Sequence, residues 1–387
     1  MNRLYYERPY LTSCECKVIS LKKTDKNIEV KTDPCIFYPE GGGQSGDTGL
    51  LGPYQVTGTV KDEKDEPVLL LDLSSDTVKK GMVLIQKIDW EHRYKYMKMH
   101  TAQHLLSGLL FNMFRIGTTA VHLGEKYLTI ETDQSAVSDE TIQELVKAAN
   151  RAIWESHSVN IREMSHRDAE ALGLRRSIKV DGDVRLVEIE GVDLIACGGV
   201  HVQKTSEIGL VTYLSRELIR GHVRLYFKCA EAAFDKAVSS ELEMAKICAL
   251  LSCSEAEAAR KVAKMQLDLT RATARISLFE VGQAEEEIKE NLKDGAAVFE
   301  SSLSVSRFQG LVKKFPDIAL CVVNTGEGST NWLIGLTGRF EELSASLREK
   351  LLTPCGAKGG GRLPLFQGVI ETEKKKDFLD SFKEFLK

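Results

Sequence analysis

The hydrophobic period of this chain changes near Glu91, and the change limits the folds that the chain can adopt. From Cys14 to about Trp90, apolar and polar residues alternate in short runs such as 17–21 and 54–56, separated by glycine and aspartate. Alternation is typical of half-buried strands, because successive side chains of a strand point to opposite faces. From Glu91 onward the apolar residues recur every three to four positions, which predicts a helix of about six turns.

The segment after this helix predicts a mixed α+β domain. Ser138 is expected to cap a second helix over 138–156, because a serine hydroxyl accepts a hydrogen bond from an N–H group at the start of a helix. Strand-like runs follow at 184–189, 193–196, 209–213 and 222–227. Helices and strands are thus expected to share one core in this part of the chain.

Residues 230–293 are rich in helix-forming residues and contain a heptad pattern. The apolar positions alternate by four and three residues: Ala258, Val262, Met265, Leu269, Ala272, Ile276 and Phe279. This spacing is that of a helical hairpin or coiled coil. Because the pattern lasts only about three heptads, we expect a spacer or dimer arm rather than a fibre.

Together these patterns predict a multidomain α+β protein. We expect a small β-barrel over residues 1–90, a mixed α+β domain over 91–229, a helical, coiled-coil spacer over 230–293 and a small α/β domain over 294–387. The chain has 387 residues, 43% of them hydrophobic, so it is long enough to bury substantial cores. Its apolar runs are too short to cross a bilayer, and no membrane association is expected.

Cysteine content and charge favour a cytoplasmic location. The nine cysteines are scattered from Cys14 to Cys355, unlike the dense disulfide framework of a small secreted domain, so we expect reduced thiols. The formal net charge of −4 offers no general attraction for nucleic acid. Any RNA contact must therefore come from local basic stretches, for which 162–179 and 216–228 are candidates, although solvated surfaces explain both equally well.

Two pairs of residues carry the ligand types of a metal site. His100 and His104 lie four positions apart and so share one face of the predicted helix. Much farther along, the loop 197–201 supplies Cys197 and His201, and the two glycines between them allow a tight turn. Three imidazoles and one thiolate form the donor set that zinc favours over calcium or magnesium. The sequence therefore predicts one Zn²⁺ per chain.

The chemistry of this metal is not determined by the residues around it. A peptidase of the His-Glu-x-x-His type needs a glutamate after its first histidine, but position 101 is threonine. Four protein ligands ordinarily make a structural site, whereas catalysis requires a coordination position that is open to water or substrate. Closed and open coordination thus remain alternatives. His122 and Asp193 stand near these motifs, and we expect them to serve the core or the surface.

The two ligand pairs resemble those of the editing domain shared by alanyl-tRNA synthetases and the stand-alone AlaX proteins. A second stretch, residues 37–49 with glycines at 41–43, resembles the glycine-rich motif of the same family. The alternative for this stretch is a plain hairpin loop. Two departures from the family pattern are Val200, where threonine is usual, and the missing glycine near Cys229.

The resemblance implies roles for residues near the predicted metal. Bare backbone at Gly42 and Gly43 would approach an aminoacyl ester, while the amide of Gln44 would donate to or orient the reacting group. Thr101 would supply a further polar contact to the substrate. These residues are our candidates for catalysis and substrate binding.

The tail also resembles that family. Glycines 359–361 together with Gln367 and Gly368 are similar to the C-terminal domain of long AlaX proteins and alanyl-tRNA synthetases, which is associated with tRNA binding and dimerisation. The implied tRNA-binding residues are Lys358, Gly359, Gly360, Gly361 and Arg362. Cations beside exposed glycine amides can hold phosphate. Without the resemblance, a tight turn between a strand and a helix is the simpler interpretation.

Because the resemblance extends nearly end to end, it implies a function for the whole chain. That function is trans-editing, the zinc-dependent hydrolysis of the ester in tRNA(Ala) that carries a noncognate amino acid. Serine, glycine or both are candidate substrates, and a homodimer through the helical spacer or the C-terminal domain is an open alternative. The sequence contains no ATP-binding P-loop and nothing upstream of Met1 that could activate an amino acid, so we expect no use of ATP.

Three other functions are compatible with parts of the sequence. The first is a tRNA-binding protein whose zinc is purely structural, and the second is tRNA editing of the threonyl type, which uses a similar metal pattern. The third is a phosphoesterase, because the tail also resembles a domain found fused to such enzymes. Phosphoesterase catalysis would need clustered metal-binding aspartates, and the sequence shows no dense Asp/His motif of that kind.

Overall fold

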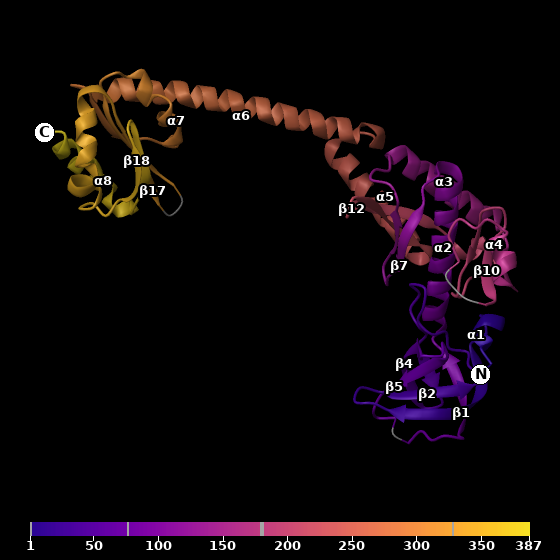
Figure 1. Ribbon diagram of the computed structural model, residues 1–387. Coiled ribbons are helices and arrows are strands. Elements are labelled where there is room, and N and C mark those ends of the chain that lie inside the picture. Colours follow the sequence, from indigo (N-terminus) through magenta and orange to yellow (C-terminus); the bar gives the residue numbers. More distant parts are fainter. Residues whose placement is uncertain (1, 76, 179–181, 327–328) are drawn as a thin grey trace. The chain divides into compact units, whose positions relative to one another are not determined.

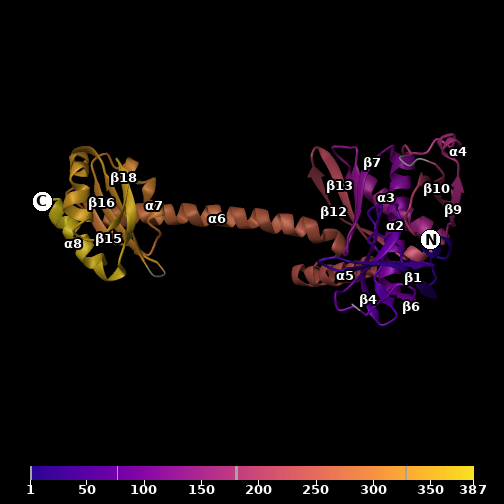
Figure 2. The ribbon, with the colours of Figure 1, turned by 60° about the horizontal axis from the view of Figure 1, so that its bottom comes forward.

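The computed structural model describes residues 2–75, 77–178, 182–326 and 329–387 (Figures 1 and 2). The chain divides into two compact units, residues 1–246 and residues 247–387. The expected multidomain α+β class is confirmed, and so is the β-barrel at its start. The finer division at residues 90, 229 and 293 stays a prediction. None of the helices in the described ranges combines the length and apolar character that a bilayer crossing requires.

The first unit contains nineteen elements, the last of which crosses into the second unit. In chain order they are α1 (Leu4–Glu7), β1 (Ser13–Lys23), β2 (Ile28–Asp33), β3 (Gly49–Leu51), β4 (Tyr54–Lys61), β5 (Pro67–Leu71), β6 (Val83–Ile88), α2 (Trp90–Phe114), β7 (Thr118–Leu123), β8 (Leu128–Thr132), α3 (Asp139–Glu155), β9 (Val159–Met164), α4 (His166–Glu170), β10 (Val184–Ile189), β11 (Asp193–Ala196), the 3-10 helix η1 (Thr205–Ile208), β12 (Val211–Ile219), β13 (His222–Cys229) and α5 (Ala230–Leu251), counted over the described residues.

The barrel closes through six strands in the order β1-β2-β5-β4-β3-β6. Alternate residues of its strands fill the interior, among them Val18, Val30, Val56 and Leu69, all of which are fully buried. This alternation is what the short period-two runs of the sequence predicted. The glycine-rich stretch 37–48 follows β2 and connects it to β3 as an irregular loop.

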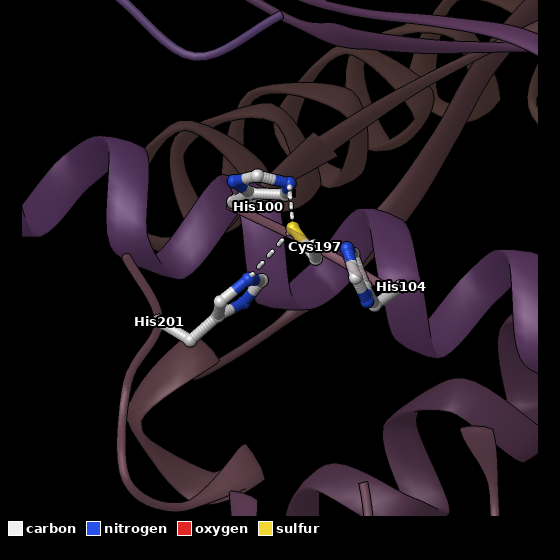
Figure 3. A group of neighbouring side chains, drawn as sticks. All are labelled: His100, His104, Cys197 and His201. Carbon is white, nitrogen blue, oxygen red and sulfur yellow. Dashed lines mark hydrogen bonds between the residues drawn. The ribbon is translucent and has the colours of Figure 1, made fainter. Parts of the chain in front are cut away.

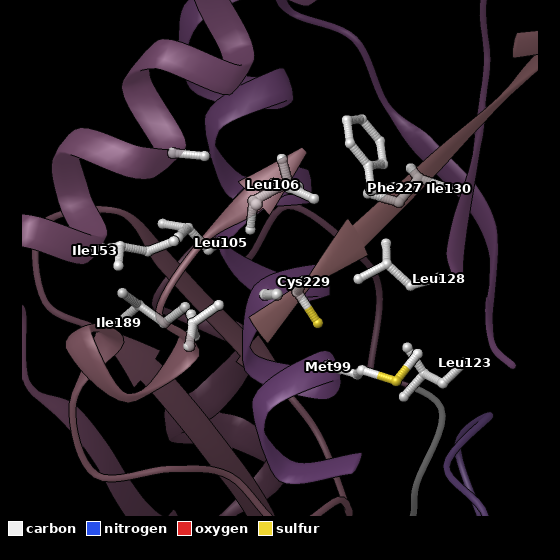
Figure 4. Packing of buried hydrophobic residues seen from close by; sticks show 14 of the residues in the cluster. Met99, Leu105, Leu106, Leu123, Leu128, Ile130, Ile153, Ile189, Phe227 and Cys229 are labelled. Atoms are coloured by element: carbon white, nitrogen blue, oxygen red, sulfur yellow. The ribbon is translucent and has the colours of Figure 1, made fainter. Parts of the chain in front are cut away.

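Helix α2 begins directly after the barrel and forms the centre of the first unit. Its N-cap is Asp89, whose side chain accepts a hydrogen bond of 3.1 Å from the backbone N–H of His92. Apolar side chains of α2, such as Leu105 and Leu106, pack against β8, β13 and α3, as Figure 4 shows. A helix that is covered on several sides also buries its polar residues, and this explains why both predicted histidines of α2 are buried.

The other elements of the first unit cover α2. Helix α3 is capped by Ser138, which accepts from the backbone N–H of Thr141 at 3.2 Å, so the predicted second helix and its cap are confirmed. One sheet has the order β12-β13-β8-β7, and a second sheet has the order β11-β10-β9. Strand β11 is an edge strand of the second sheet, and the loop 197–201 leaves its end beside α2.

The second unit contains one long helix and a six-stranded sheet. In chain order its elements are α6 (Glu255–Asn291), β14 (Leu292–Lys293), β15 (Ala296–Glu300), α7 (Ser306–Gln309), η2 (Val312–Lys314), β16 (Ala319–Thr325), β17 (Thr330–Leu336), η3 (Gly338–Ala345), the π-helical turn η4 (Arg348–Leu352), β18 (Lys358–Arg362), β19 (Leu365–Ile370), η5 (Thr372–Lys374) and α8 (Lys375–Phe385), again over the described residues.

The sheet of the second unit lies between two layers of helix, as Figure 2 shows for α7 and α8. Its order is β14-β15-β16-β17-β19-β18. Leu320 and Val322 of β16 pack with the end of α6 and with α7, whereas Cys321 and Val323 pack with α8. Successive residues of one strand thus serve two cores, which explains the unbroken apolar run 318–323 in the sequence.

One local expectation for the second unit is wrong. Residues 340–352, for which the sequence also predicts one α-helix, form the 3-10 segment η3 and the wider turn η4 instead. Both Leu351 and Leu352 are buried there, in the same core as Phe378 and Phe382 of α8. Residues 358–362 form the edge strand β18, so the tight turn that was the alternative for this stretch does not occur.

A buried ion pair fixes the start of α2 to the barrel. The Arg93 side chain is fully buried, and its Nε donates to Asp47 at 2.8 Å, with a second contact between Nη2 and the same carboxylate. The remaining donors reach the carbonyls of Pro9, at 2.8 Å, and Ile36, at 2.6 Å. These acceptors lie before β1 or between β2 and β3, so one guanidinium joins α2 to the N-terminal segment and to the glycine-rich loop.

We expect Arg93→Met to lower the free energy of unfolding by about 3–5 kcal/mol, because it leaves the Asp47 charge buried without a partner. Arg224→Met is the control: its guanidinium is 29% exposed and pairs with Glu131, so the loss should stay near 1 kcal/mol. Urea denaturation of both variants measures the difference. Equal losses in the two variants would contradict the role given to Arg93.

Candidate metal centre

The four predicted ligands converge in the structure. His100 and His104 come from α2, Cys197 and His201 come from the loop after β11, and Figure 3 shows the four side chains facing one another. Their ligand atoms all lie within 4.8 Å of one another. The Cys197 Sγ is 3.4 Å from Nε2 of His100 and 3.4 Å from Nε2 of His201. Residues almost a hundred positions apart thus form one compact donor set.

The Nδ1 atom of each of two histidines is held by an oxygen outside the donor set. The Oε1 of Gln44 accepts from the backbone N–H of Val200 at 3.2 Å, so it must also accept from Nδ1 of His100, at 2.8 Å. The Thr101 hydroxyl donates to Met97 at 2.9 Å and therefore accepts from Nδ1 of His201, at 3.1 Å. Both histidines then carry their proton on Nδ1 and offer the lone pair of Nε2.

Near Nδ1 of the third histidine, His104, lies a carboxylate oxygen. Nδ1 of His104 has no hydrogen-bond partner among the described residues, and Oδ2 of Asp193 lies 3.6 Å away. Asp193 is held by Arg175 through contacts of 2.7 and 3.0 Å, and both side chains of this pair are almost fully buried. Its position depends on Gly108 of α2, where a Cβ would lie 2.8 Å from the Cβ of Asp193.

Burial sets the protonation of the donor set. Removal from water, together with the nearby charge of Arg175, lowers the pKa of His104 to about 3; desolvation likewise places the pKa of His100 and His201 well below the ordinary value. All three imidazoles are therefore neutral at physiological pH, as metal ligands must be. Burial raises the pKa of the Cys197 thiol, so binding of a cation would release the proton of that thiol.

Gly199 is required for the close approach of the loop to α2. A Cβ at this position would lie 2.1 Å from Cε1 of His100 and 3.1 Å from Oε1 of Gln44. At the other glycine of the loop, Gly198, the nearest atom to a Cβ is the Tyr6 hydroxyl at 3.5 Å, an ordinary contact. The loop therefore needs its second glycine for space.

The glycine-rich loop reaches the metal cluster through Gln44. Gly42 and Gly43 have φ of +61° and +84°, a region that favours glycine, and Gly41 and Gln44 exchange backbone hydrogen bonds of 3.1 and 3.0 Å around them. This turn directs Gln44, only 1% exposed, against His100. Its Nε2 is buried and has no partner among the described residues. A buried donor without an acceptor is costly, and such a group is a candidate for substrate contact.

A polar cleft of about 700 Å³ opens next to the metal cluster. Cys197 and Gly198 line it, and so do cations from separate parts of the first unit: Arg3, Lys61, Lys64, Arg176 and Arg185. Arg185 donates to the carbonyl of Cys197 at 2.7 Å and lies over the ring of Tyr6. Asp65, Glu163 and Asp183 also line the cleft, so its rim is positive only by the excess of five cations over three carboxylates. One ligand of the candidate metal site, Cys197, lies in its wall.

The two basic stretches of the sequence differ in the partners of their cations. In 216–228 two of the three arginines pair with carboxylates, Arg216 with Asp139 and Arg224 with Glu131 and Glu217, whereas Arg220 forms no salt bridge with a described residue. In 162–179, whose last residue, Lys179, lies outside the described residues, Arg175 belongs to the metal cluster. Arg176 lines the cleft and forms no salt bridge with any described residue. It is thus the cation of these stretches that is placed to meet an anionic ligand beside the metal cluster.

The expected tRNA-binding residues lie in β18 of the second unit. Lys358, Arg362 and the three glycines between them are all exposed. A Cβ on Gly359 or on Gly361 would lie 2.3 Å from a carbonyl oxygen of β19, whereas Gly360 has open space. Two of the glycines are therefore needed for strand pairing, and the strand presents bare backbone between two cations at the edge of the sheet.

Comparison with known proteins agrees with the motifs. Residues 184–226 match the family described as "Threonyl and Alanyl tRNA synthetase second additional domain". The chain is 34% identical over 242 residues to the alanyl-tRNA editing protein AlaX-L of Pyrococcus horikoshii, covering 61% of this chain and 60% of that protein. It is 26% identical to the alanine–tRNA ligase of Ignicoccus hospitalis, covering 96% of this chain and 42% of the ligase, and 29% identical to that of Pyrococcus abyssi, covering 99% and 43%.

The chain spans less than two thirds of the length of each of these relatives. It is a relative of alanyl-tRNA editing proteins and alanine–tRNA ligases, and the resemblance expected from its motifs is confirmed. The matched family includes threonyl-tRNA synthetases, so this match alone does not separate the two amino-acid systems. The three relatives all carry names of the alanine system.

Asp193 and Arg175 are residues of the candidate metal site that the sequence alone did not predict. The available signal was a carboxylate at the start of the otherwise apolar strand 193–196, four residues before Cys197. A carboxylate in such a place must find a buried partner. The identity of that partner is a matter of tertiary structure, because Arg175 and His104 are not near Asp193 in the sequence.

We expect Asp193→Asn to weaken metal binding by about 10- to 100-fold, because the amide removes the negative charge beside Nδ1 of His104. The matched control is Glu188→Gln, which neutralises a carboxylate of the neighbouring strand β10 that pairs with the exposed Arg162. Competition with a chromophoric chelator measures both affinities, and circular dichroism checks the fold. Unchanged affinity in the folded Asp193→Asn variant would show that His104 is oriented by other means.

Proposed function

We propose that this relative of the alanyl-tRNA editing proteins is a zinc-dependent trans-editing hydrolase of the cytoplasm. Its substrates are molecules of tRNA(Ala) that carry a noncognate amino acid, Ser-tRNA(Ala) and also Gly-tRNA(Ala). The observation that carries the proposal is the buried, unpartnered Nε2 of Gln44 beside a cluster of three neutral imidazoles and one thiol. A purely structural cluster has no need of a free donor in this place.

The donor set fits Zn²⁺. Two imidazoles are fixed with Nε2 toward the cluster, a carboxylate lies behind the third, and a cysteine sulfur completes an N₃S set. Such a set matches zinc rather than magnesium or calcium, which prefer oxygen ligands. His100, His104, Cys197 and His201 would hold the ion. When bound, Zn²⁺ supplies Lewis acidity that polarises an ester carbonyl or activates a water molecule.

The glycine-rich loop positions the ester. Gln44 is held through Oε1, which accepts from Val200 and His100, so its Nε2 has a fixed direction and can donate to the ester carbonyl oxygen as negative charge develops there. The exposed Gly42 and Gly43 have no side chains to obstruct the terminal ribose. Water adds to the carbonyl carbon, the ester C–O bond breaks, and the products are the free amino acid and the ribose hydroxyl.

The role of Thr101 follows from its contacts. Its hydroxyl is buried and bonded to Met97, His201 and Val202. We therefore propose that Thr101 serves the substrate site by orienting His201.

The cleft with the positive rim is the proposed entry of the acceptor end. Aminoacyl-tRNA carries its ester at the end of a single strand whose phosphates need cations. Arg3, Lys64 and Arg176 surround the passage that ends at Cys197. In the second unit, Lys358, Arg362 and the bare backbone of β18 are proposed to hold phosphates of another part of the tRNA.

One observation favours a second candidate function. Four protein donors fill a tetrahedral site and leave no position for substrate, which is the usual arrangement of structural zinc. A tRNA-binding protein with structural zinc would share the fold, the cleft and β18. It would differ in one respect, because it would not release the amino acid.

The proposed function is tested by release of labelled serine from Ser-tRNA(Ala). We expect rapid release by the wild-type chain, with Ala-tRNA(Ala) spared, since a site that requires the seryl hydroxyl discriminates strongly against its absence. Gln44→Leu should lower the rate by about 10²–10³-fold through loss of one donor, and His104→Ala should abolish it through loss of the metal. Glu188→Gln is again the surface control.

The outcomes separate the two candidates. Serine release that collapses in both variants supports editing. Folded, zinc-loaded wild-type protein that binds tRNA(Ala) and releases no amino acid from the seryl or glycyl ester would establish the structural-zinc alternative, and release of serine from Ser-tRNA(Thr) in its place would establish the threonyl type.

We expect Arg176→Ala to raise the KM for Ser-tRNA(Ala) by about fivefold, to leave kcat nearly unchanged and to reduce the salt dependence of binding, because one phosphate contact is lost. Arg167→Ala, a change of another cation in the same stretch but outside the cleft lining, is the control. Steady-state kinetics at two salt concentrations measure both effects. An equal response of the two variants would show that the cleft does not hold the acceptor strand.

A further inference from the structure

Two cysteines flank the turn that joins α5 to α6 (Figure 1). Cys248 lies in the last turn of α5, and Cys253 directly precedes Ser254, the N-cap residue of α6. Both are free thiols, both are partly exposed, and both belong to the second unit. Reagents in the solvent can therefore reach this pair.

The backbone of the turn sets the two side chains next to each other. The N–H of Ser252, whose φ is +49°, donates to the carbonyl of Ala249 at 3.2 Å. The N–H of Cys253 donates to the carbonyl of Cys248 at 3.1 Å. These two bonds around a left-handed residue form the Schellman motif, in which the side chains of the first and the sixth residue commonly touch. In this turn the first residue is Cys248 and the sixth is Cys253.

The side chains show the contact that the motif predicts. A hydrogen bond joins the two thiol groups, which places the sulfur atoms side by side. Desolvation raises the pKa of the Cys248 thiol, and the neighbouring Cys253 and Glu255 act in the same direction. A disulfide requires Cβ atoms that are close and directed toward each other, and here a local capping motif supplies that proximity.

Other cysteines of the chain are less suited to form such a pair. Cys14 and Cys16 stand two residues apart in β1, which separates their Cβ atoms by about 6.5 Å, whereas a disulfide needs about 3.5–4.5 Å. Cys355 has Cys321 as its neighbour, but Cys321 is fully buried in the sheet. The remaining cysteines are buried or belong to the metal cluster.

We propose that Cys248 and Cys253 form a dithiol modification site, which hydroperoxides convert to an intramolecular disulfide. The sulfur of one thiol attacks the hydroperoxide and its O–O bond breaks, which gives a sulfenic acid and an alcohol, or water when the oxidant is hydrogen peroxide. The second thiol attacks the sulfenic sulfur, the S–S bond forms, and the hydroxyl leaves as water. The two thiols lose two protons and two electrons, and the hydroperoxide accepts both.

The disulfide closes a ring across the end of α5. In the thiol form the last turn of α5 is held by backbone hydrogen bonds near the surface, and Leu250 within it is 86% exposed, so this turn can unwind locally. The disulfide keeps the first and sixth residues together when those bonds open. Chymotryptic cleavage after Leu250 should therefore be slower in the oxidised chain, and equal rates would show that the disulfide does not hold the turn.

The first experiment treats the full-length chain with increasing hydrogen peroxide, followed by iodoacetamide and trypsin. Both cysteines lie in one tryptic peptide, residues 247–260, whereas Cys355, also partly exposed, lies alone in residues 351–358. We expect peptide 247–260 to carry two alkyl groups before oxidation. After oxidation it should carry none, be lighter by two hydrogen atoms than the unmodified peptide, and regain both alkyl groups after treatment with dithiothreitol.

Cys355 is the internal control of this experiment. It should still be alkylated at the peroxide concentration that closes the disulfide, because it lacks an accessible second thiol. Two alkyl groups retained on peptide 247–260 when Cys355 is already oxidised, or a disulfide from either cysteine to a different part of the chain, would overturn the proposal.

The second experiment tests the proximity of the thiols without oxidation. Phenylarsine oxide, a trivalent arsenical, forms two As–S bonds with a neighbouring pair of thiols and releases water. We expect one equivalent to protect peptide 247–260 from alkylation in the wild type. Cys248→Ser and Cys253→Ser should each weaken this binding about 10²-fold, because the second bond of the chelate is lost. Cys355→Ser is the matched control, and circular dichroism checks the fold. Equal affinity in the wild type and in both variants of the pair would overturn the dithiol site.

Discussion

The buried pair of Arg93 and Asp47 determines the geometry on which the candidate site depends. Arg93 stands two turns before His100 on α2, and Asp47 stands three residues after Gln44 in the glycine-rich loop. One ion pair thus relates the helix that supplies two candidate metal ligands to the loop that supplies the free amide. Because both charges are buried, the pair is stable only in the one geometry in which each finds its partner, and the loop is held at a fixed distance from the helix.

Three different side chains orient the three histidines of the donor set. Gln44, Thr101 and Asp193 each place an oxygen near the Nδ1 of one histidine, and each comes from a different element. Neutral imidazoles with a fixed tautomer are what a metal requires, and burial supplies the neutrality while these oxygens supply the orientation. Gln44 differs from the other two because its amide nitrogen is left without an acceptor among the described residues. In the proposed function, this free amide is the group that contacts the substrate.

Much of the fold could be predicted from local patterns. The period-two runs, the six-turn helix and the Ser138 cap all appear in the structure, because alternation, helical spacing and capping depend on residues within a few positions of one another. The segment 340–352 could not be predicted, because its 3-10 and π-helical turns depend on packing against the core of the second unit and not on a local pattern. The strand β18 was also missed, because five residues with three glycines carry no strand pattern, and their pairing depends on the approach of β19.

By itself the sequence determined the donor types and their pairing: two histidines four apart on a helix, and a cysteine and a histidine around two glycines. It also determined the family resemblance, because motifs are local. Only the tertiary structure decided that Asp193 and Arg175 stand behind His104, that Thr101 holds His201, and that Arg176 faces a cleft while Arg224 is paired with carboxylates. The physical reason is that burial and hydrogen bonding between distant segments arise from packing, and no spacing along the chain records which segments will meet.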